Sequence, residues 1–151
     1  MKNAEGKPLE RKNSRSFVFD TGALHLYFAG DKNLKQLFHD IEKGVSDGFT
    51  SEQNAAELYY KTCENLGRDT ALIRYRSLRG SSLIVIAPDD GLSLNAVQIK
   101  CAHRSKLSLI DAYIISLAKR VRGTLYTTDP RIYDLKIVPT KLLEIGEVTR
   151  S

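Results

Sequence analysis

The stretch FVFDTGAL, residues 17–24, decides the fold class of this chain. Its apolar residues 17–19 predict a short buried strand that ends at Asp20, and the apolar segment after Gly22 predicts a helix that reaches Phe28. A short apolar strand that leads directly into a helix is typical of parallel α/β folds. This first pair of elements therefore indicates an α/β architecture.

The alternation of strand and helix continues along the chain. Apolar spacing and turn residues predict helices at 33–42, 50–66, 69–79, 91–105 and 108–121, and extended segments at 48–49, 82–87, 124–128 and 136–139. The run at 82–87 is apolar throughout, which is typical of a strand buried on both faces. The order of the elements predicts an open parallel sheet that is covered by helices on both sides.

Length and composition indicate one globular domain behind a charged leader. The chain has 151 residues, of which 42% are hydrophobic and 27% are charged, and no apolar run approaches the roughly 18 residues of a membrane span. Residues 1–16 carry five basic and two acidic side chains, so we expect a flexible basic arm before a domain at 17–151. Cys63 and Cys101 form no metal-binding spacing, which favours a reduced, cytoplasmic setting. The net charge of +5 favours a polyanionic partner.

Two acidic residues follow predicted strands. Asp20 ends the first strand and Asp129 ends the strand at 124–128, and ligand sites in open α/β sheets lie beyond the carboxyl ends of strands. Each residue also has a structural interpretation. Asp20 could cap the helix that follows it, and Asp129 with Pro130 could simply start a turn.

Two further acids lie on predicted helices. Asp111 lies in a helix that is apolar nearly all round, so we expect a largely desolvated carboxylate that needs a cation, hydrogen bonds or a proton. The structural alternative is a capping box with Ser108. Glu57 fits an exposed ion pair with Lys61, although its apolar neighbours indicate a helix that packs on more than one side.

The four acids together would form an oxygen-only site suited to Mg²⁺ or Mn²⁺. Zinc is disfavoured because His25, His39 and His103 form no ligand spacing, and neither do the two cysteines. The sequence contains no glycine-rich phosphate loop and no nucleophile elbow. Nucleotide binding through such a loop and serine-hydrolase chemistry are therefore disfavoured as well.

Four blocks of the sequence resemble the PIN-domain family, especially the VapC-like toxin nucleases of prokaryotic toxin–antitoxin pairs. The blocks are FVFDTGAL with Asp20, SEQNAAELYY with Glu57, LSLIDAYIISLAK with Asp111, and TLYTTDPRIY with Asp129. They follow one another in the order of the family over residues 17 to about 140. The resemblance implies a three-layer α/β/α sandwich with a short parallel sheet, and metal-dependent endonucleolytic cleavage of RNA.

By match of motif, the resemblance assigns roles to six residues. The metal-binding and catalytic acids are Asp20, Glu57, Asp111 and Asp129, and the hydroxyls that orient them are Thr21 and Thr127. A bound metal ion would lower the pKa of a water molecule and offset charge on the leaving oxygen. The last block departs from the family at one position: Ile132 stands where an aromatic residue is frequent, and Tyr133 follows it.

The same resemblance implies the partners: RNA, a cognate antitoxin and a second copy of the chain in a homodimer. Arg74, Arg76 and Arg104 are candidates to hold the RNA backbone around the acids. The apolar residues at 24–28 could serve the core or an interface. One rival interpretation is a catalytically silent PIN-like module that binds RNA or protein. The other is a receiver-type phosphoryl-transfer protein. That function would need an acidic pair near the first strand, where Thr21 follows Asp20, and a late lysine, which Leu125 and Tyr126 do not supply.

Overall fold

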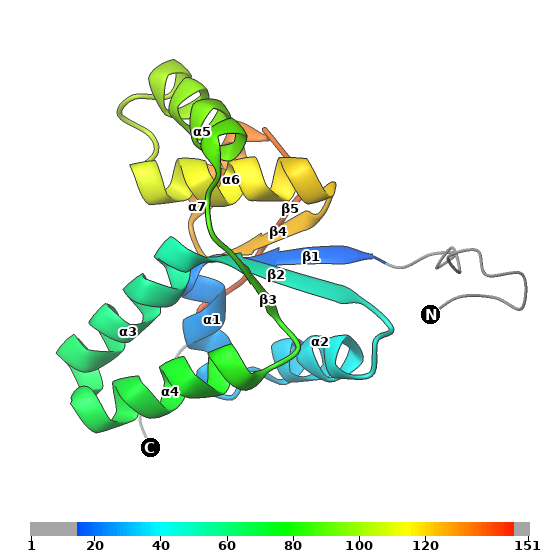
Figure 1. The fold of residues 1–151 in the computed structure, drawn as a ribbon, viewed down its shortest axis with the longest axis vertical. Helices are drawn as coiled ribbons and strands as arrows, with labels where there is room; N and C mark the ends of the chain where they lie inside the picture. The colour runs from blue at the N-terminus through cyan, green and yellow to red at the C-terminus, as the bar shows by residue number, and fades with distance from the viewer. Residues whose placement is uncertain (1–14, 147–151) are drawn as a thin grey trace, which may run out of the picture.

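The computed structural model describes residues 15–146 and contains a five-stranded parallel sheet with helices on both faces (Figure 1). Residues 1–14, which make up most of the expected basic arm, and residues 147–151 lie outside the described part of the chain. The elements in chain order are β1 (Ser16–Phe19), α1 (Thr21–Phe28), α2 (Lys32–Glu42), β2 (Asp47–Ser51), α3 (Glu52–Leu66), α4 (Arg68–Gly80), β3 (Ile84–Ile86), α5 (Asp90–Ala102), α6 (Leu109–Val121), β4 (Thr124–Thr127), α7 (Pro130–Leu135) and β5 (Thr140–Leu142). The predicted α/β class is confirmed.

The first strand lies at the centre of the sheet, whose order is β3-β2-β1-β4-β5. All neighbouring strands are parallel, and Val18 pairs with Phe49 of β2 on one side and with Leu125 of β4 on the other. The backbone N–H of Asp20 donates to the carbonyl of Tyr126 at 3.2 Å. Because parallel strands end at the same edge of a sheet, the residues that follow β1 and β4 become neighbours there.

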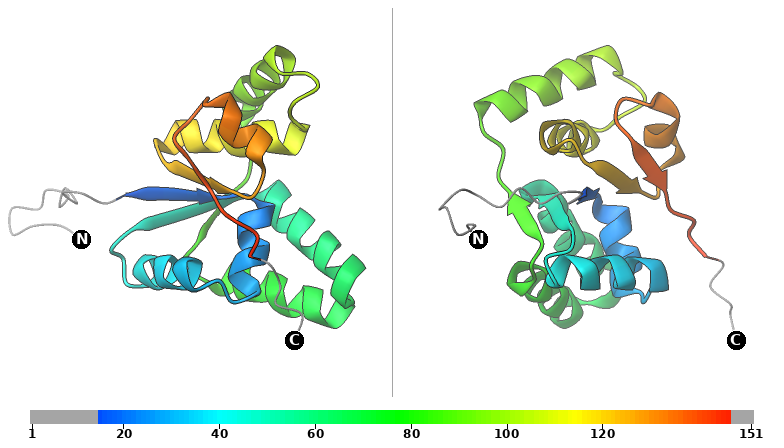
Figure 2. Two further views of the ribbon diagram at one scale, coloured as in Figure 1. Left: turned by 180° about the vertical axis from the view of Figure 1, so that it is seen from behind. Right: turned by 90° about the vertical axis from the view of Figure 1, so that its right-hand side faces the viewer.

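Alternate residues of β1 face two separate cores. Val18 packs among residues of α5, α6 and α7, whereas Phe17 and Phe19 pack with residues of α1, α2, α3 and α4. Figure 2 shows these two helical layers on opposite sides of the sheet. The apolar residues at 24–28 lie in or against the second of these cores. The monomer therefore uses them in its own packing.

The apolar helix α6 lies between the sheet and α5 (Figure 1). Six of its residues are buried: Ala112, Ile114, Ile115, Ser116, Leu117 and Ala118. Its apolar character is explained by this position in the core. Within residues 15–146, no helix combines the length and the apolar character that crossing a bilayer requires.

The strand expected at 82–87 is shorter and more exposed than its sequence indicated. Only Ile84–Ile86 form β3, which pairs with β2 alone at the edge of the sheet. Ile84 is 45% exposed, so the expectation of a strand buried on both faces is wrong. An apolar run fixes the extended conformation of this segment but not its place in the strand order.

The chain after β4 differs most from the expectation. The turn considered as an alternative at Asp129 and Pro130 is the start of the short helix α7, and the last strand begins at Thr140 rather than at residue 136. Lys136 has a φ of 51° and ends α7, which rules out a strand there. The carbonyl of Pro139 accepts from Leu125 N at 2.9 Å, so pairing starts at the end of the predicted segment.

Candidate active site in an acidic cleft

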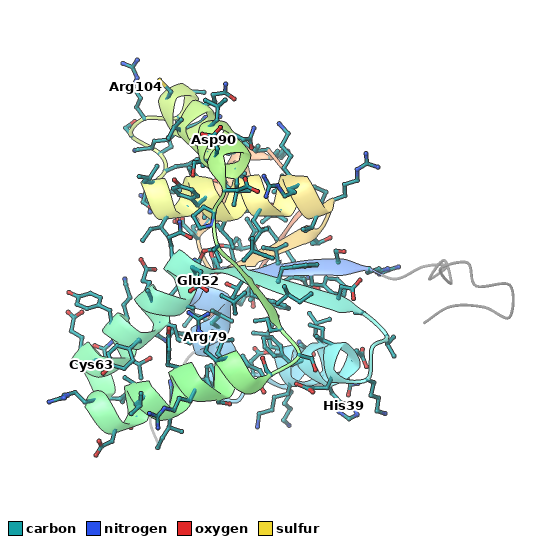
Figure 3. The ribbon with its side chains drawn as sticks, viewed as in Figure 1. His39, Glu52, Cys63, Arg79, Asp90 and Arg104 are labelled. Carbon is teal, nitrogen blue, oxygen red and sulfur yellow. The ribbon has the colours of Figure 1, made fainter. Side chains whose placement is uncertain are left out.

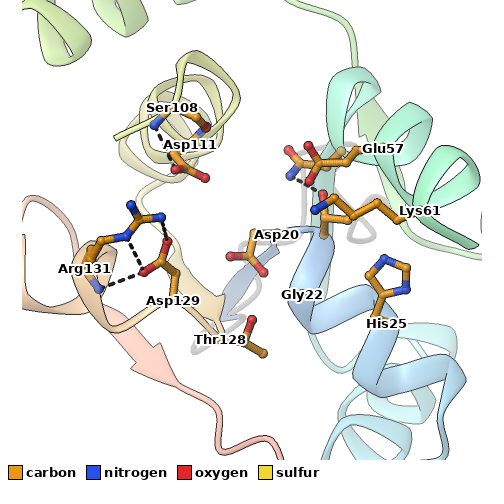
Figure 4. Close-up of a pocket in the computed structure, with 12 residues that line it drawn as sticks. Asp20, Gly22, His25, Glu57, Lys61, Ser108, Asp111, Thr128, Asp129 and Arg131 are labelled. Atoms are coloured by element: carbon orange, nitrogen blue, oxygen red, sulfur yellow. Dashed lines mark hydrogen bonds and ion pairs between the residues drawn. The ribbon is translucent and has the colours of Figure 1, made fainter. Parts of the chain in front are cut away.

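Four acidic side chains from separate elements line one open cleft at the carboxyl edge of the sheet (Figure 4). Asp20 follows β1, Glu57 lies in α3, Asp111 lies in the first turn of α6, and Asp129 comes two residues after β4. The volume of the cleft is about 380 Å³. The sheet topology thus brings together all four acids that the sequence singled out.

Asp20 is the most buried of these acids, with 7% of its surface exposed. It is the N-cap of α1, and its carboxylate accepts a hydrogen bond from Ala23 N at 2.9 Å. Burial raises the pKa of Asp20 to about 6, although hydrogen bonds from Thr127 and Ala23 oppose the rise and the charges of Asp111 and Asp129 add to it. The ionised carboxylate is therefore held at a cost that a bound cation would relieve.

Asp111 is less buried than its apolar neighbours suggested. Only half-buried, it forms a reciprocal capping box in which Asp111 N donates to Ser108 Oγ and Ser108 N donates to Asp111 Oδ2, both at 3.0 Å. The expectation of a largely desolvated Asp111 is wrong, because the buried residues of α6 begin only at Ala112, after Asp111. One carboxylate oxygen makes the cap, and the side chain lines the cleft at the same time.

Glu57 belongs to a polar face of α3 that lines the cleft. Asn54, Glu57 and Lys61 are spaced at i, i+3 and i+7, which places them on one side of the helix. The expected ion pair between Glu57 and Lys61 is not formed in the described part of the chain. Both side chains are therefore available to the cleft.

Asp129 is bound by an arginine of the same chain. It caps α7 by accepting from Arg131 N at 2.9 Å, and its two oxygens accept from Arg131 Nε at 3.2 Å and from Arg131 Nη2 at 2.9 Å. Burial alone would raise the pKa of Asp129, but the hydrogen bonds from Arg131 outweigh it and hold that pKa below its ordinary value. Figure 4 shows the Asp129 carboxylate turned toward this guanidinium.

Buried hydroxyl and amide groups tie the elements of the cleft together. Thr127 is fully buried, hydrogen bonds to Asp20, and accepts from Asp129 N at 3.0 Å. Thr21 instead accepts from Asn54 Nδ2 at 3.0 Å, and Asn54 Oδ1 accepts in turn from Ser51 Oγ at 2.5 Å. Of the two hydroxyls that the sequence singled out, Thr127 thus contacts the acids directly, whereas Thr21 connects α1 to α3.

Gly22 allows α1 to approach the connection between β4 and α7. A Cβ atom at this position would lie 2.0 Å from Thr128 Oγ1, closer than atoms can pack, and 3.1 Å from Thr128 Cβ, which is a tight contact. The missing side chain therefore keeps the segments that carry Asp20 and Asp129 close to each other.

The basic side chains that line the cleft are not those proposed from the sequence. His25, Lys61 and Arg131 line it, whereas Arg74, Arg76 and Arg104 do not. Arg104 lies in the connection between α5 and α6, at the far end of that layer (Figure 3). Arg74 lies over the Phe28 ring at 5.7 Å and, after burial, is the next largest cause that lowers the pKa of His25.

Helical spacing could have identified the cleft residues that sequence reasoning left without a site role. His25 lies one turn after Thr21, and Asn54 and Lys61 share a face with Glu57. Arg131 gave no such signal, because its contact with the site depends on the unpredicted helix α7.

The donor set of the cleft fits a hard divalent cation. It offers four carboxylates and one histidine, and oxygen ligands are those that Mg²⁺ and Mn²⁺ prefer. Within residues 15–146, however, no three side chains of the acidic, histidine or cysteine types are gathered closely enough to hold an ion as they stand. Metal binding at this cleft would therefore require carboxylates to turn inward, Asp129 among them.

Comparisons with known proteins agree with this architecture. The PIN domain family model matches residues 17–138. DNA-bound VapBC from Salmonella typhimurium has 16% identity and a TM-score of 0.70 over 84% of this chain and 97% of the other. VapBC2 from Rickettsia felis, bound to a DNA fragment from its promoter, has 13% identity and a TM-score of 0.69 over 85% and 99%.

A third similar structure is VapC20 from Mycobacterium tuberculosis, described as a toxin that cleaves the sarcin–ricin loop. It has 17% identity and a TM-score of 0.65 over 81% of this chain and 96% of the other. A search of curated proteins found no match. At these identities the solved structures establish a shared fold.

Proposed function

This chain belongs to the PIN-domain family, and from that premise we propose that it is a metal-dependent endoribonuclease that acts as the toxin of a toxin–antitoxin pair. The observation that carries the proposal is the convergence of four carboxylates on one cleft, with Asp20 buried and its pKa raised to about 6. A toxin described as cleaving the sarcin–ricin loop and two VapBC complexes, all of similar fold, support it.

In the proposed reaction, Asp20, Asp111 and Asp129 hold one or two Mg²⁺ or Mn²⁺ ions, and Glu57 binds directly or through water. The bound ion supplies an activated water molecule and offsets charge on the leaving oxygen. Asp20 has to be ionised for this role, and the hydrogen bond from Thr127 favours that form. The capping box with Ser108 fixes the backbone at Asp111 and uses one of its two carboxylate oxygens, and the N-cap of α7 fixes the backbone at Asp129.

Basic side chains on both walls of the cleft hold the RNA backbone in this proposal. His25 and Lys61 supply one wall from α1 and α3, and Arg131 supplies the other from α7. Arg74, close enough to His25 to lower the pKa of that imidazole, extends the first wall outward. Arg76 and Arg104 remain candidates for outer contacts with a longer RNA.

The proposed partners are a cognate antitoxin, as in the VapBC complexes of similar fold, and a second copy of the chain in a homodimer. Activity on cellular RNA would place the protein in the cytoplasm. The free thiols of Cys63 and Cys101 are compatible with its reducing conditions.

The test is cleavage of a single-stranded RNA by the purified protein with Mg²⁺, with Mn²⁺ and with a chelator, for wild type and Asp20→Asn. Wild type should cleave only with a divalent ion. Asp20→Asn keeps the shape of the side chain and its ability to cap α1 but removes a charged ligand, so the rate should fall by about two orders of magnitude or more.

Asp89→Asn is the matched control. Asp89 caps α5 by accepting from Leu92 N at 2.8 Å, as Asp20 caps α1, but it does not line the cleft. This variant should cleave like wild type. RNA binding by the folded wild type without any metal-dependent cleavage would favour the rival function, a catalytically silent binding module.

A further inference from the structure

Arg131 forms an ion pair with one of the acids of the cleft. Three ion pairs in the described part of the chain join Arg79 to Glu52, Arg120 to Asp89 and Arg131 to Asp129, and of these three the last lies at the cleft. The Arg131 side chain donates to both oxygens of Asp129, and its guanidinium lies over the side of the cleft that also carries Asp111 (Figure 4).

This arrangement conflicts with metal binding at Asp129. The backbone N–H and Nε of Arg131 take both lone pairs of Asp129 Oδ1, and Nη2 takes one of the two on Oδ2. A divalent cation at Asp129 would also meet the guanidinium charge, and two cations on one carboxylate repel each other. The contact with Arg131 turns the Asp129 carboxylate away from the side of the cleft where Asp20 lies. An ion that binds between the acids therefore has to displace the guanidinium.

Displacement of Arg131 is easy because the pair is near solvent. The Arg131 side chain is 66% exposed, and exposed ion pairs contribute little net free energy. Its backbone N–H would still cap Asp129, so α7 stays anchored when the guanidinium leaves. A released guanidinium at the mouth of the cleft has the planar fork that binds phosphate through two hydrogen bonds.

We propose that Arg131 is a displaceable counter-cation: it competes with the divalent ion for Asp129 and, once displaced, holds a phosphate of the RNA strand. The inference rests on the proposed function and deepens it by naming a residue that exchanges Asp129 for an RNA phosphate when the metal ion binds. In the metal-free protein Arg131 pairs with Asp129. In the metal-loaded protein it binds a phosphate of the RNA.

The chain contains a matched pair that lies elsewhere. Arg120 Nη1 and Nη2 donate to Asp89 Oδ2 and Oδ1 at 2.8 and 2.7 Å, and Asp89 is likewise the N-cap of a helix. Arg120→Gln therefore removes the same charge and the same kind of pair as Arg131→Gln, but outside the cleft. Any difference between the two variants comes from the position of Arg131.

The first readout is Mn²⁺ binding in the absence of RNA, measured by titration calorimetry on full-length wild type, Arg131→Gln and Arg120→Gln. Loss of the competitor should tighten Mn²⁺ binding by about three- to tenfold in Arg131→Gln and leave Arg120→Gln like wild type. Equal affinities in Arg131→Gln and wild type, equal tightening in both variants, or no Mn²⁺ binding by wild type would each overturn the competition.

The second readout is single-turnover RNA cleavage at saturating Mn²⁺ as the enzyme concentration is varied. In Arg131→Gln the half-saturating concentration should rise several-fold, while the rate at saturation stays within about twofold of wild type. If Arg131→Gln binds Mn²⁺ more tightly but its half-saturating concentration equals that of wild type, Arg131 does not bind an RNA phosphate. If wild type does not cleave at all, the proposed function fails, and the calorimetric comparison still decides whether Arg131 competes with the ion.

Discussion

Asp20 serves two roles that make opposite demands on a carboxylate. As the N-cap of α1 it is held by Ala23 N, and an ionised oxygen suits that role. As the buried acid of the cleft it loses hydration and faces other acids, which raises its pKa to about 6. The sequence indicated Asp111 as the desolvated acid, but the structure shows that Asp20 is the more buried of the two. The end of a central strand lies deeper in the molecule than the first turn of α6.

The raised pKa predicts a pH-dependent stability. Between pH 3.8 and about 6 the unfolded state releases the Asp20 proton first, so the folded state loses relative stability as the pH rises. Above that range the penalty is constant at up to about 3 kcal/mol. Asp20→Asn, which still caps α1, should therefore raise the metal-free unfolding free energy by about 1–3 kcal/mol at neutral pH and by little at about pH 4.

Urea denaturation in the presence of a chelator measures this effect, and Asp89→Asn provides a control of opposite sign. The Asp89 pKa is lowered to about 2, first by the hydrogen bond from Arg120, so neutralising it should remove stability at neutral pH rather than add it. An Asp20→Asn protein that is no more stable than wild type at neutral pH would show that the cleft does not strain Asp20.

At the scale of elements, the network around Asn54 holds the two helices of one wall together. Asn54 is 2% exposed, and it bonds to Ser51 at the start of α3 and to Thr21 at the start of α1. Asn54→Ala should lower the unfolding free energy by about 1–3 kcal/mol, because buried hydroxyls lose their partners. Since Glu57 and Lys61 follow on the same helix, RNA cleavage at saturating metal should fall as well.

Asn95→Ala is the control that separates the effect of Asn54→Ala on stability from its effect on cleavage. Asn95 accepts from Ser116 Oγ at 2.8 Å and so joins α5 to α6, in the other layer of the molecule. This variant should lose stability in chemical denaturation but retain cleavage under conditions where it is folded. Wild-type cleavage by a folded Asn54→Ala protein would mean that the network supports the fold alone.

Elements that depend on local sequence signals were predictable, and features that depend on strand order were not. The helices before residue 122 and the central strands were predictable, because apolar periodicity and caps are local signals, as at Ser51 and Ser108. The position of β3 at the edge and the start of β5 were not, because both depend on strand order. The helix α7 was missed since an Asp-Pro pair starts turns as readily as it starts a helix.

The same distinction applies to the site. The four acids were predictable from strand ends, helix faces and the family motif, and they line one cleft. Arg131 and the burial of Asp20 were not, because they arise from the packing of α7 and α1 against neighbouring elements. Ile132 illustrates the limit of motif matching: it is 2% exposed and takes the buried position of α7, while Tyr133 is 43% exposed.

At the scale of the whole molecule, the chain carries a net charge of +5 although four acids line its cleft. Residues 2–14 hold four basic and two acidic side chains, and Arg15, directly before β1, contacts the sheet, since its carbonyl accepts from Asp47 N at 2.9 Å. Deletion of residues 2–14 should weaken RNA binding at low salt and flatten its salt dependence by about one to two units. Single-turnover cleavage at saturating enzyme should stay nearly unchanged.

Lys32→Gln with Lys35→Gln is the control for that deletion, because it removes the same net charge from the exposed side of α2. If the arm contacts phosphates, the salt slope should fall more in the deletion than in this double variant. Identical salt slopes in the two proteins would mean that the arm acts only through its net charge and does not contact phosphates.

The central claim is that the cleft acids jointly bind a divalent cation, and anomalous diffraction from crystals soaked in Mn²⁺ tests it most directly. The account predicts a Mn²⁺ peak within about 2.5 Å of carboxylate oxygens of Asp20 and at least one of Asp111 and Asp129, with Arg131 moved off Asp129. The contrary result is a saturating soak in which Mn²⁺ occupies exposed acids elsewhere, the cleft holds no peak, and Arg131 stays paired with Asp129.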